Sequence, residues 1–252
     1  MMNKIGRFIV GLKTGVAYSN WVARGGGRAI HDSQLQYVGS NFRIMVMLFD
    51  KAVKEHAIHS FEFNGDSYNY EMSTYNDSAF NERTVEVPIF TRILSSHAGK
   101  RVLEVGNVLS HYMPVSHTVV DKYERAPGVT NSDIIDFSGS HRYDLVICIS
   151  TLEHIGFDEP LKEPEKITKA LQHIKQLLGP DGLGWFSVPL GYNPNIDSLA
   201  FGNCDLIGER HFMRRLNFGN DWVECNADEC RGIVYGSRYP CANAIMIFTV
   251  KP

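Results

Sequence analysis

Short apolar runs alternate with segments of helical periodicity over the second half of the chain. The runs occupy residues 101–110, 119–121, 132–137 and 143–150, and acidic or small polar residues stand at or near their ends. Runs of this length, rich in Val and Ile and bounded by turn residues, are typical of buried parallel strands. The carboxyl ends of such strands line the ligand crevice of an open α/β sheet. The polar residues that end the runs are therefore predicted to lie where a nucleotide would bind.

A helix and a further strand follow these runs. Residues 165–178 place apolar side chains at spacings of three and four, which predicts an amphipathic helix. The sequence Gly179-Pro180-Asp181-Gly182 ends that helix, and residues 183–188 supply the next strand. Strands that alternate with helices in this way predict βαβ units and a parallel sheet.

The first part of the chain has a different pattern. Residues 41–56 are predicted to form a helix, and residues 60–70 alternate apolar and polar side chains around Asn64-Gly65, which indicates a hairpin. We therefore predict two parts, an N-terminal helical and hairpin extension over residues 1–95 and a ligand-binding α/β domain over residues 96–252.

Composition narrows the class of partner. The chain has 252 residues, 44% of them hydrophobic, and a formal net charge of −3, which gives no electrostatic footprint for nucleic acid. No nucleic-acid partner is predicted, and small molecules or a glycan are the more natural ligands. Five cysteines, an odd number with Cys148 inside an apolar run, indicate free thiols and a reducing, cytoplasmic setting.

No segment approaches the roughly 18 apolar residues of a membrane span, so no transmembrane segment is predicted. Residues 5–13 have the character of a short amphipathic helix, and docking onto the body of the protein, onto a second subunit of a homo-oligomer or onto a membrane surface all stay open. The spacing of Cys225 and Cys230 does not fit the usual zinc pattern, and no metal site is predicted. A divalent ion on Asp197 or Glu153 is the alternative.

Five motifs occur in order between residues 101 and 190. They are Leu103-Glu104-Val105-Gly106, Asp121, Asp136, Tyr143-Asp144-Leu145-Val146 and Leu152-Glu153-His154. In this order and spacing they resemble the core of a class I S-adenosylmethionine-dependent methyltransferase. The resemblance implies an α/β fold, a three-layer Rossmann-like sandwich with a seven-stranded sheet of six parallel strands and one antiparallel strand. It also implies that residues 244–250 form the last, antiparallel strand, paired with residues 222–225.

The resemblance implies S-adenosyl-L-methionine as the cofactor and a set of residues that contact it. Asp121 is expected to accept the ribose hydroxyls, Asp136 to bind the exocyclic amine of adenine, and Phe137 to pack on the adenine face. A loop cap for Asp136 and core packing for Phe137 are the alternatives. The remaining expected contacts are Glu104, Gly106 and Asn107 in the first loop, Ser150 after the fourth strand, and Arg83 at the cofactor carboxylate.

The first loop departs from the family pattern, because Val108 and Ser110 stand where members commonly carry two further glycines. β-Branched Val resists positive φ, so the loop must run differently or the following helix must start elsewhere, with Ser110 as its cap and Asn107 bonding the turn. A catalytically degenerate cofactor-binding or assembly module is the alternative that this departure favours.

For catalysis, His154 is the leading candidate as general base and Glu153 accompanies it, because both follow the fourth strand at the crevice edge. His111 and His211 are weaker candidates. Polar and aromatic residues that suit a hydroxyl-rich acceptor are Tyr75, Asn76, Tyr192, Asn193 and Asp197. The predicted reaction is methyl transfer to a hydroxyl of a small polar acceptor such as a sugar or glycan precursor. N-methylation of a small amine is the alternative, and a nucleotide-sugar or NAD enzyme is disfavoured because no G-x-G-x-x-G is present.

Overall fold

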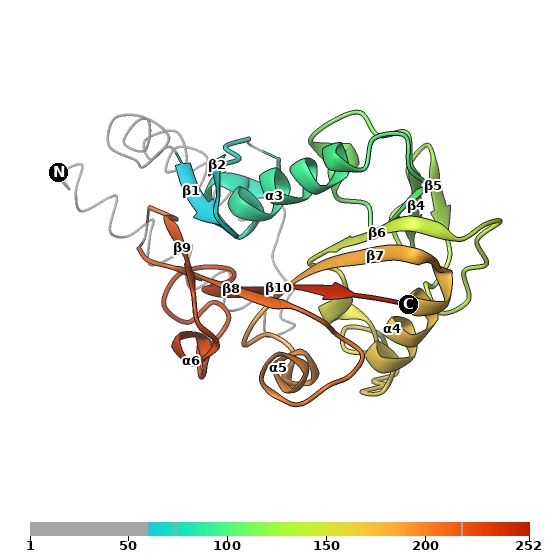
Figure 1. The fold of residues 1–252 in the computed structure, drawn as a ribbon. Coiled ribbons are helices and arrows are strands. Elements are labelled where there is room, and N and C mark those ends of the chain that lie inside the picture. The colour runs from blue at the N-terminus through green and yellow to red at the C-terminus, as the bar shows by residue number, and fades with distance from the viewer. Residues whose placement is uncertain (1–59, 74, 218) are drawn as a thin grey trace, which may run out of the picture.

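The computed structural model describes residues 60–73, 75–217 and 219–252. The predicted helices over residues 5–13 and 41–56 lie outside these ranges. Within them, one eight-stranded sheet forms the centre of the molecule (Figure 1). Its strands, in spatial order, are β5 (Val129–Asn131), β4 (Thr118–Asp121), β3 (Val102–Val105), β6 (Tyr143–Ile149), β7 (Leu178–Pro189), β10 (Ala244–Val250), β8 (Arg210–Arg215) and β9 (Trp222–Cys225).

The sheet confirms the predicted mostly parallel architecture and adds one strand to it. The five strands from β5 to β7 pair in parallel, β10 is antiparallel to both β7 and β8, and β9 is antiparallel to β8. Six strands therefore run in one direction, while β10 and β9 run in the other. The predicted pairing of residues 244–250 with residues 222–225 is wrong, because β8 lies between them. That strand reads Arg-His-Phe-Met-Arg-Arg, and its charges hide the apolar pattern.

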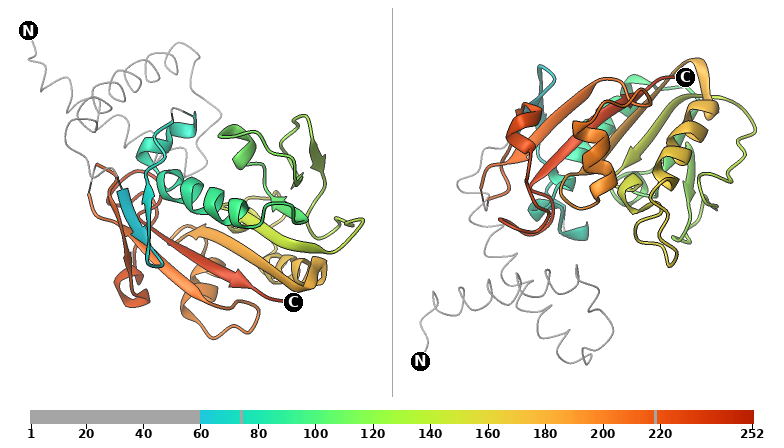
Figure 2. Two further views of the ribbon diagram at one scale, coloured as in Figure 1. Left: turned by 45° about the horizontal axis from the view of Figure 1, so that its top comes forward. Right: turned by 90° about the horizontal axis from the view of Figure 1, so that it is seen from below.

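Both faces of the sheet are covered, which explains the continuous apolar runs. On β6, Val146 and Cys148 face one core with the helices α4 (Lys166–Leu177) and α5 (Pro194–Phe201), whereas Leu145 and Ile147 face a second core. The second core is closed by α3 (Arg83–Ser96) and the hairpin of β1 (Ser60–Phe63) and β2 (Asp66–Asn69). Figure 2 shows these layers on opposite sides of the sheet. The three-layer sandwich is therefore the observed fold.

The local predictions are met to different degrees. The helix predicted over residues 165–178 is α4, and the strand predicted over residues 183–188 lies inside β7. The hairpin turns at Asn64 and Gly65, which both have positive φ, as a two-residue turn between twisted strands requires. The run at residues 132–137 is not a strand. The short β5 precedes it, and the run folds into turns that bury Ile134 and Phe137.

The remaining elements are short. They are the 3₁₀ turns η1 (Tyr75–Phe80), η2 (Leu109–His111) and η3 (Leu152–His154) and the helix α6 (Ala227–Cys230). The predicted boundary near residue 95 falls in the last turn of α3, and the described part of the extension packs on the sheet. No helix in the described ranges has the length and apolar character to cross a membrane.

Candidate active site

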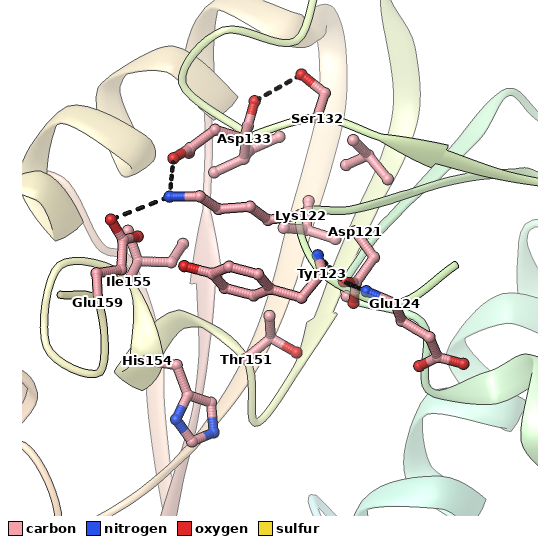
Figure 3. A pocket seen from close by; sticks show the side chains of 14 residues that line it. Asp121, Lys122, Tyr123, Glu124, Ser132, Asp133, Thr151, His154, Ile155 and Glu159 are labelled. Atoms are coloured by element: carbon pink, nitrogen blue, oxygen red, sulfur yellow. Dashed lines mark hydrogen bonds and ion pairs between the residues drawn. The ribbon is translucent and has the colours of Figure 1, made fainter. Parts of the chain in front are cut away.

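A cavity of about 320 Å³ opens at the carboxyl ends of β3 and β4 (Figure 3). Of the residues predicted as functional, it brings together Gly106, Asp121 and His154. The full lining is Val105, Gly106, Val120, Asp121, Lys122, Tyr123, Glu124, Ser132, Asp133, Ile134, Thr151, His154, Ile155 and Glu159. The crevice predicted from the strand ends is therefore present as a hollow in the described part of the chain.

Gly106 brings the backbone of the first loop close to η3. Its φ is +86°, and a Cβ built there would lie 2.2 Å from Thr151 Oγ1 on the opposite wall of the cavity. The Gly106 amide also donates to the carbonyl of Val120 at 2.8 Å, which ties the loop to β4. Any other residue at this position would be strained in its backbone and would clash with Thr151.

Asp121 organises the loops on both sides of the cavity. Its Oδ2 accepts from the backbone amide of Asn107 at 3.0 Å, and its Oδ1 accepts from the amides of Tyr123 and Glu124 at 2.8 and 2.7 Å. Each carboxylate oxygen has two lone pairs, so Oδ1 is fully used and one accepting position, on Oδ2, remains for a ligand. The carboxylate is thus both held rigidly and directed at the cavity.

Glu104 acts differently from the direct contact that the motif implied. It is fully buried and absent from the cavity lining. Its Oε1 accepts from the amides of Val108 and Leu109 at 3.0 and 2.8 Å, and its Oε2 lies 2.7 Å from His117 Nε2. The structure therefore makes Glu104 the residue that holds the first loop in place.

The hydrogen bonds from the Val108 and Leu109 amides to Glu104 explain how the loop accommodates Val108 where members of the family that the motifs resemble commonly carry a glycine. Val108 has φ −108°, so the loop takes no positive φ there and continues into η2, not into an α-helix. Ser110 is not a helix cap, since its hydroxyl donates to Asn107 Oδ1 at 2.6 Å. Asn107 does bond the turn, and its Nδ2 donates to Glu124 Oε1 at 2.8 Å. Of the two predicted alternatives, the loop runs differently.

The residues expected to bind adenine lie outside the cavity lining. Asp136 is exposed, and Phe137 is buried in the core that contains α4. Asp133 and Ile134, the same acidic and apolar pair three residues earlier, line the cavity instead. The signal was in the sequence, but β5 is too short and polar to fix where the strand ends.

Asp133 belongs to an ion-pair network on one wall of the cavity (Figure 3). Lys122 Nζ lies 2.8 Å from Asp133 and 3.0 Å from Glu159, and Lys166 Nζ lies 2.6 Å from each of them. Burial acts to raise the pKa of both carboxyls, but hydrogen bonds from the two lysines outweigh it and lower the pKa of each. Both acids are therefore ionised at neutral pH.

His154 is held by a polar chain at the rim. Its ring is half exposed, its Nδ1 contacts the carboxylate of Asp158, and the Tyr192 hydroxyl donates to the same carboxylate at 2.6 Å. Because Asp158 occupies Nδ1, the other ring nitrogen, Nε2, is the one left to exchange a proton. That nitrogen lies 3.5 Å from Glu153 Oε1.

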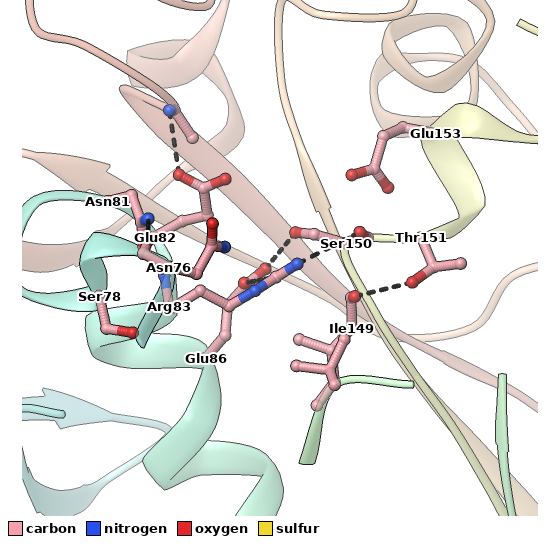
Figure 4. A network of polar contacts seen from close by, with 12 residues as sticks. Asn76, Ser78, Asn81, Glu82, Arg83, Glu86, Ile149, Ser150, Thr151 and Glu153 are labelled. Atoms are coloured by element: carbon pink, nitrogen blue, oxygen red, sulfur yellow. Dashed lines mark hydrogen bonds and ion pairs between the residues drawn. The ribbon is translucent and has the colours of Figure 1, made fainter. Parts of the chain in front are cut away.

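A second polar cluster lies beside the cavity, between α3 and η3 (Figure 4). Arg83 pairs with Glu86 and donates to the carbonyl of Ser150 at 3.4 Å, while the Ser150 hydroxyl donates to Glu86 Oε1 at 2.5 Å. Glu153 faces this group and is buried, and its Oε2 has no hydrogen-bond partner in the part of the chain that the structure describes. Arg83 and Ser150, predicted as cofactor contacts, are placed in this cluster and do not line the cavity.

The residues predicted to bind the acceptor form two groups, one on η1 and one after β7. Tyr75 stacks on His111 at 4.3 Å, and His111 pairs with the cavity residue Glu124 at 2.8 Å, so Tyr75 lies near the cavity. Asn76 turns the chain, with φ +49°, and its carbonyl accepts from Asn81.

The other group holds the backbone after β7. Asn193 is buried, donates to the Glu153 carbonyl at 2.7 Å and caps α5, and Asp197 accepts from the Gly191 amide at 2.9 Å. Tyr192 is the member of this group that reaches the rim, through Asp158. His211 lies on β8, where it pairs with Glu224, away from the cavity lining.

The described ranges contain no group of three or more His, Cys, Asp or Glu side chains placed to hold a metal ion. Cys225 and Cys230 approach each other, with a distance of 3.4 Å between their Sγ atoms, and all five cysteines are free.

No protein-family model and no curated protein matches the chain. Solved structures do resemble it. The N-methyltransferase NodS from Bradyrhizobium japonicum WM9 in complex with S-adenosyl-L-homocysteine matches with a TM-score of 0.42 and 16% identity over 68% of this chain and 88% of that one. An S-adenosylmethionine-dependent methyltransferase from Clostridium acetobutylicum ATCC 824 matches with a TM-score of 0.35 and 12% identity over 65% and 88% of the two chains.

A third match is a possible histamine N-methyltransferase from Thermotoga maritima, with a TM-score of 0.38 and 12% identity over 64% of this chain and 86% of that one. All three are S-adenosylmethionine-dependent methyltransferases by name, the family that the motifs resemble. At identities this low, the function of the chain has to be derived from its own residues.

Proposed function

We propose that the protein transfers a methyl group from S-adenosylmethionine to a hydroxyl oxygen of a small polar acceptor, such as a sugar or glycan precursor. The observation that carries this proposal is Asp121, which ends β4 in the cavity next to the close-approach residue Gly106. A carboxylate in this place, beyond the carboxyl end of a parallel strand, suits a ribose hydroxyl, from which its Oδ2 can accept a hydrogen bond.

The cavity fits a nucleoside-like cofactor in size and chemistry. Its volume of about 320 Å³ lies within the range of small-molecule sites. Asp121 would hold the ribose, Asp133 with Ile134 would take the adenine in place of Asp136 and Phe137, and the loop held by Glu104 would offer the Gly106 backbone. The positive φ of Gly106 and its close packing against Thr151 keep a side chain out of this part of the loop.

The bound cofactor supplies a methyl group on a positively charged sulfur, so the protein mainly has to position the acceptor and remove its proton. Asp158 and Tyr192 orient His154, and Glu153 lies next to the free ring nitrogen. We assign proton removal to this His154–Glu153 pair. Tyr75 and Tyr192 provide aromatic surface near the rim for the ring of an acceptor. The cytoplasmic setting and a homo-oligomer stay predictions.

One observation favours N-methylation of a small amine as the second candidate. Three buried carboxyls, Glu82, Glu86 and Glu153, surround the single guanidinium of Arg83, and an ammonium group would balance this excess of acid. A panel of hydroxyl and amine acceptors with cofactor labelled in its methyl group separates the two candidates by the product that carries the label.

Calorimetric titration with S-adenosylmethionine, S-adenosylhomocysteine and NAD tests the proposed cofactor. We expect micromolar binding of the first two and none of NAD. Absence of binding by the first two would contradict the proposal and favour the degenerate assembly module.

A further inference from the structure

Glu153 is a buried acid whose hydrogen-bonding capacity is unfilled. Its side chain is 1% exposed, and its Oε2 has no partner among the described residues. Buried polar groups in native proteins are nearly always paired, so an unpaired carboxyl oxygen next to a ligand cavity calls for a functional explanation. The Glu153 carboxyl group points towards Ser150 and the Arg83–Glu86 pair (Figure 4).

The position of Glu153 couples it to the cavity. It lies on η3 between Thr151 and His154, which both line the cavity wall. The distance of 3.5 Å between Glu153 Oε1 and His154 Nε2 connects the buried acid to a half-exposed imidazole. A proton on Glu153 therefore has a short route to solvent, and a charge in the cavity acts on Glu153 across little protein.

Several charged and titratable groups face Glu153. They are Arg83 and Glu86 on α3, His154 on η3, Cys148 on β6, Tyr192 after β7 and Tyr235 before β10. Burial raises the pKa of Glu153 to about 7, with His154 and Arg83 opposing this rise and Glu86 adding to it. The acid is thus balanced between its two protonation states at neutral pH, where one added charge changes its ionisation.

We propose that Glu153 is the proton acceptor of the methyl-transfer site and that the positive charge of bound S-adenosylmethionine ionises it, whereas neutral-sulfur S-adenosylhomocysteine does not. This inference rests on the proposed function. The proton that Glu153 loses when the donor binds leaves through His154, which is half exposed and whose Nε2 lies 3.5 Å from Glu153 Oε1. During transfer the acceptor hydroxyl gives its proton through the cavity residue His154 to Glu153, while its oxygen bonds to the methyl carbon and the electrons of the C–S bond return to sulfur. Loss of the sulfonium charge leaves Glu153 protonated again, so the base is present only while the methyl donor is bound.

The test measures protons and needs no acceptor. Each ligand is titrated calorimetrically at pH 7 in two buffers that differ in ionisation enthalpy, and the difference in heat gives the protons released on binding. We expect S-adenosylmethionine to release up to about half a proton per site, because a group with a pKa near 7 is half protonated there. S-adenosylhomocysteine should release almost none, and the difference between the ligands should vanish near pH ~9, where Glu153 is already ionised.

Two variants test whether the proton released on binding comes from Glu153. Glu153→Gln removes the titrating group and should abolish the difference between the ligands, whereas Glu165→Gln, an exposed acid before α4, should keep it. Equal proton release by both ligands, or an unchanged difference between the ligands in Glu153→Gln, would overturn the inference about Glu153. Either result would still agree with the proposed cofactor site, because the ligands bind in both cases. Should Glu153→Gln fail to fold, the pH profile of the natural protein decides, since a difference that persists at pH ~9 excludes this acid. Binding of neither ligand would overturn the proposed function itself.

Discussion

At the scale of single residues, Asp121 is the sharpest test of the cofactor site. Asp121→Ala should weaken S-adenosylmethionine binding tenfold or more, because removal of hydrogen bonds to a charged group costs about 1.5–3 kcal/mol. The same change releases the amides of Asn107, Tyr123 and Glu124, so thermal unfolding has to be measured together with calorimetric affinity. Asp181→Ala, at an exposed aspartate on β7, is the matched control. Unchanged affinity in Asp121→Ala would refute the placement.

Asp133 and Asp136 form a second pair for comparison at this scale. Asp133→Asn should reduce cofactor affinity, because Asp133 lines the cavity and orders the ammonium groups of Lys122 and Lys166. Asp136→Asn should leave affinity within about twofold, since this exposed side chain lies outside the lining and surface changes are usually within ±0.5 kcal/mol. Calorimetry measures the cofactor affinity of both variants. A larger loss of affinity in Asp136→Asn than in Asp133→Asn would favour Asp136 as the residue that binds adenine.

Sequence alone located the residues that end well-marked strands. Gly106 and Asp121 follow runs of buried apolar residues, so their place at the sheet edge could be predicted. Asp133 could not be separated from Asp136, because the position of each depends on where a three-residue strand stops. The contacts of Ser150 with Arg83 and Glu86 join residues 67 and 64 positions apart, and no local pattern contains such information.

At the scale of elements, the loop between β3 and η2 depends on one buried carboxylate. Glu104→Gln keeps an oxygen for the Val108 and Leu109 amides but loses the charge that faces His117 at 2.7 Å. We expect a loss of about 1–3 kcal/mol in the free energy of unfolding, because the two buried amides and the His117 ring lose a charged hydrogen-bonding partner.

Urea denaturation measures that loss, and hydrogen exchange at Val108 and Leu109 locates it. Both amides should exchange faster in Glu104→Gln. Glu62→Gln, at an exposed position of β1, should change neither measurement. Unchanged exchange at the two loop amides would show that Glu104 does not hold the loop.

The predictability of the elements follows from their apolar patterns. The helix α4 was predicted within a residue at each end because Ile167, Ala170, Leu171 and Ile174 repeat on its buried face. The strand β8 was missed because arginines occupy three of its six positions. One of them, Arg215, is buried and donates to the carbonyls of Phe80 and Pro240, which only the folded chain brings together.

At the scale of the whole molecule, the layered fold could be predicted because the central parallel strands β3 and β6 are buried on both faces. The elements that cover the second face of the sheet could not be predicted. The hairpin and α3 are distant in sequence from Ile245 and Ile247, against whose side of the sheet they pack in one core. The extension predicted before residue 95 therefore contributes to the stability of the sheet in its described part, a property that no pattern within the extension itself reveals.

Some carboxyl groups have lowered pKa values and others have raised ones. Together they predict how the stability of the whole molecule depends on pH. Asp133 and Glu159 have lowered pKa values, so the stability they contribute is present above the unfolded pKa near 4 and is lost as the pH falls below it. Glu153 changes the stability of the folded state in the opposite direction as the pH rises. Its pKa of about 7 against 4.5 in the unfolded chain means that the native state holds the extra proton, so stability falls as the pH rises between these values.

We therefore expect the free energy of unfolding to be greatest near pH ~5 and to fall toward pH ~8 by roughly 3 kcal/mol from Glu153. Buried Glu82 and half-buried Asp197, whose pKa values are also raised by desolvation, add in the same direction. Urea denaturation at the two pH values measures the fall, and Glu153→Gln should flatten it because an amide does not titrate. A natural protein that gains stability between pH ~5 and pH ~8, or a variant with an unchanged slope, would show that Glu153 is ionised throughout and cannot respond to the charge of the cofactor.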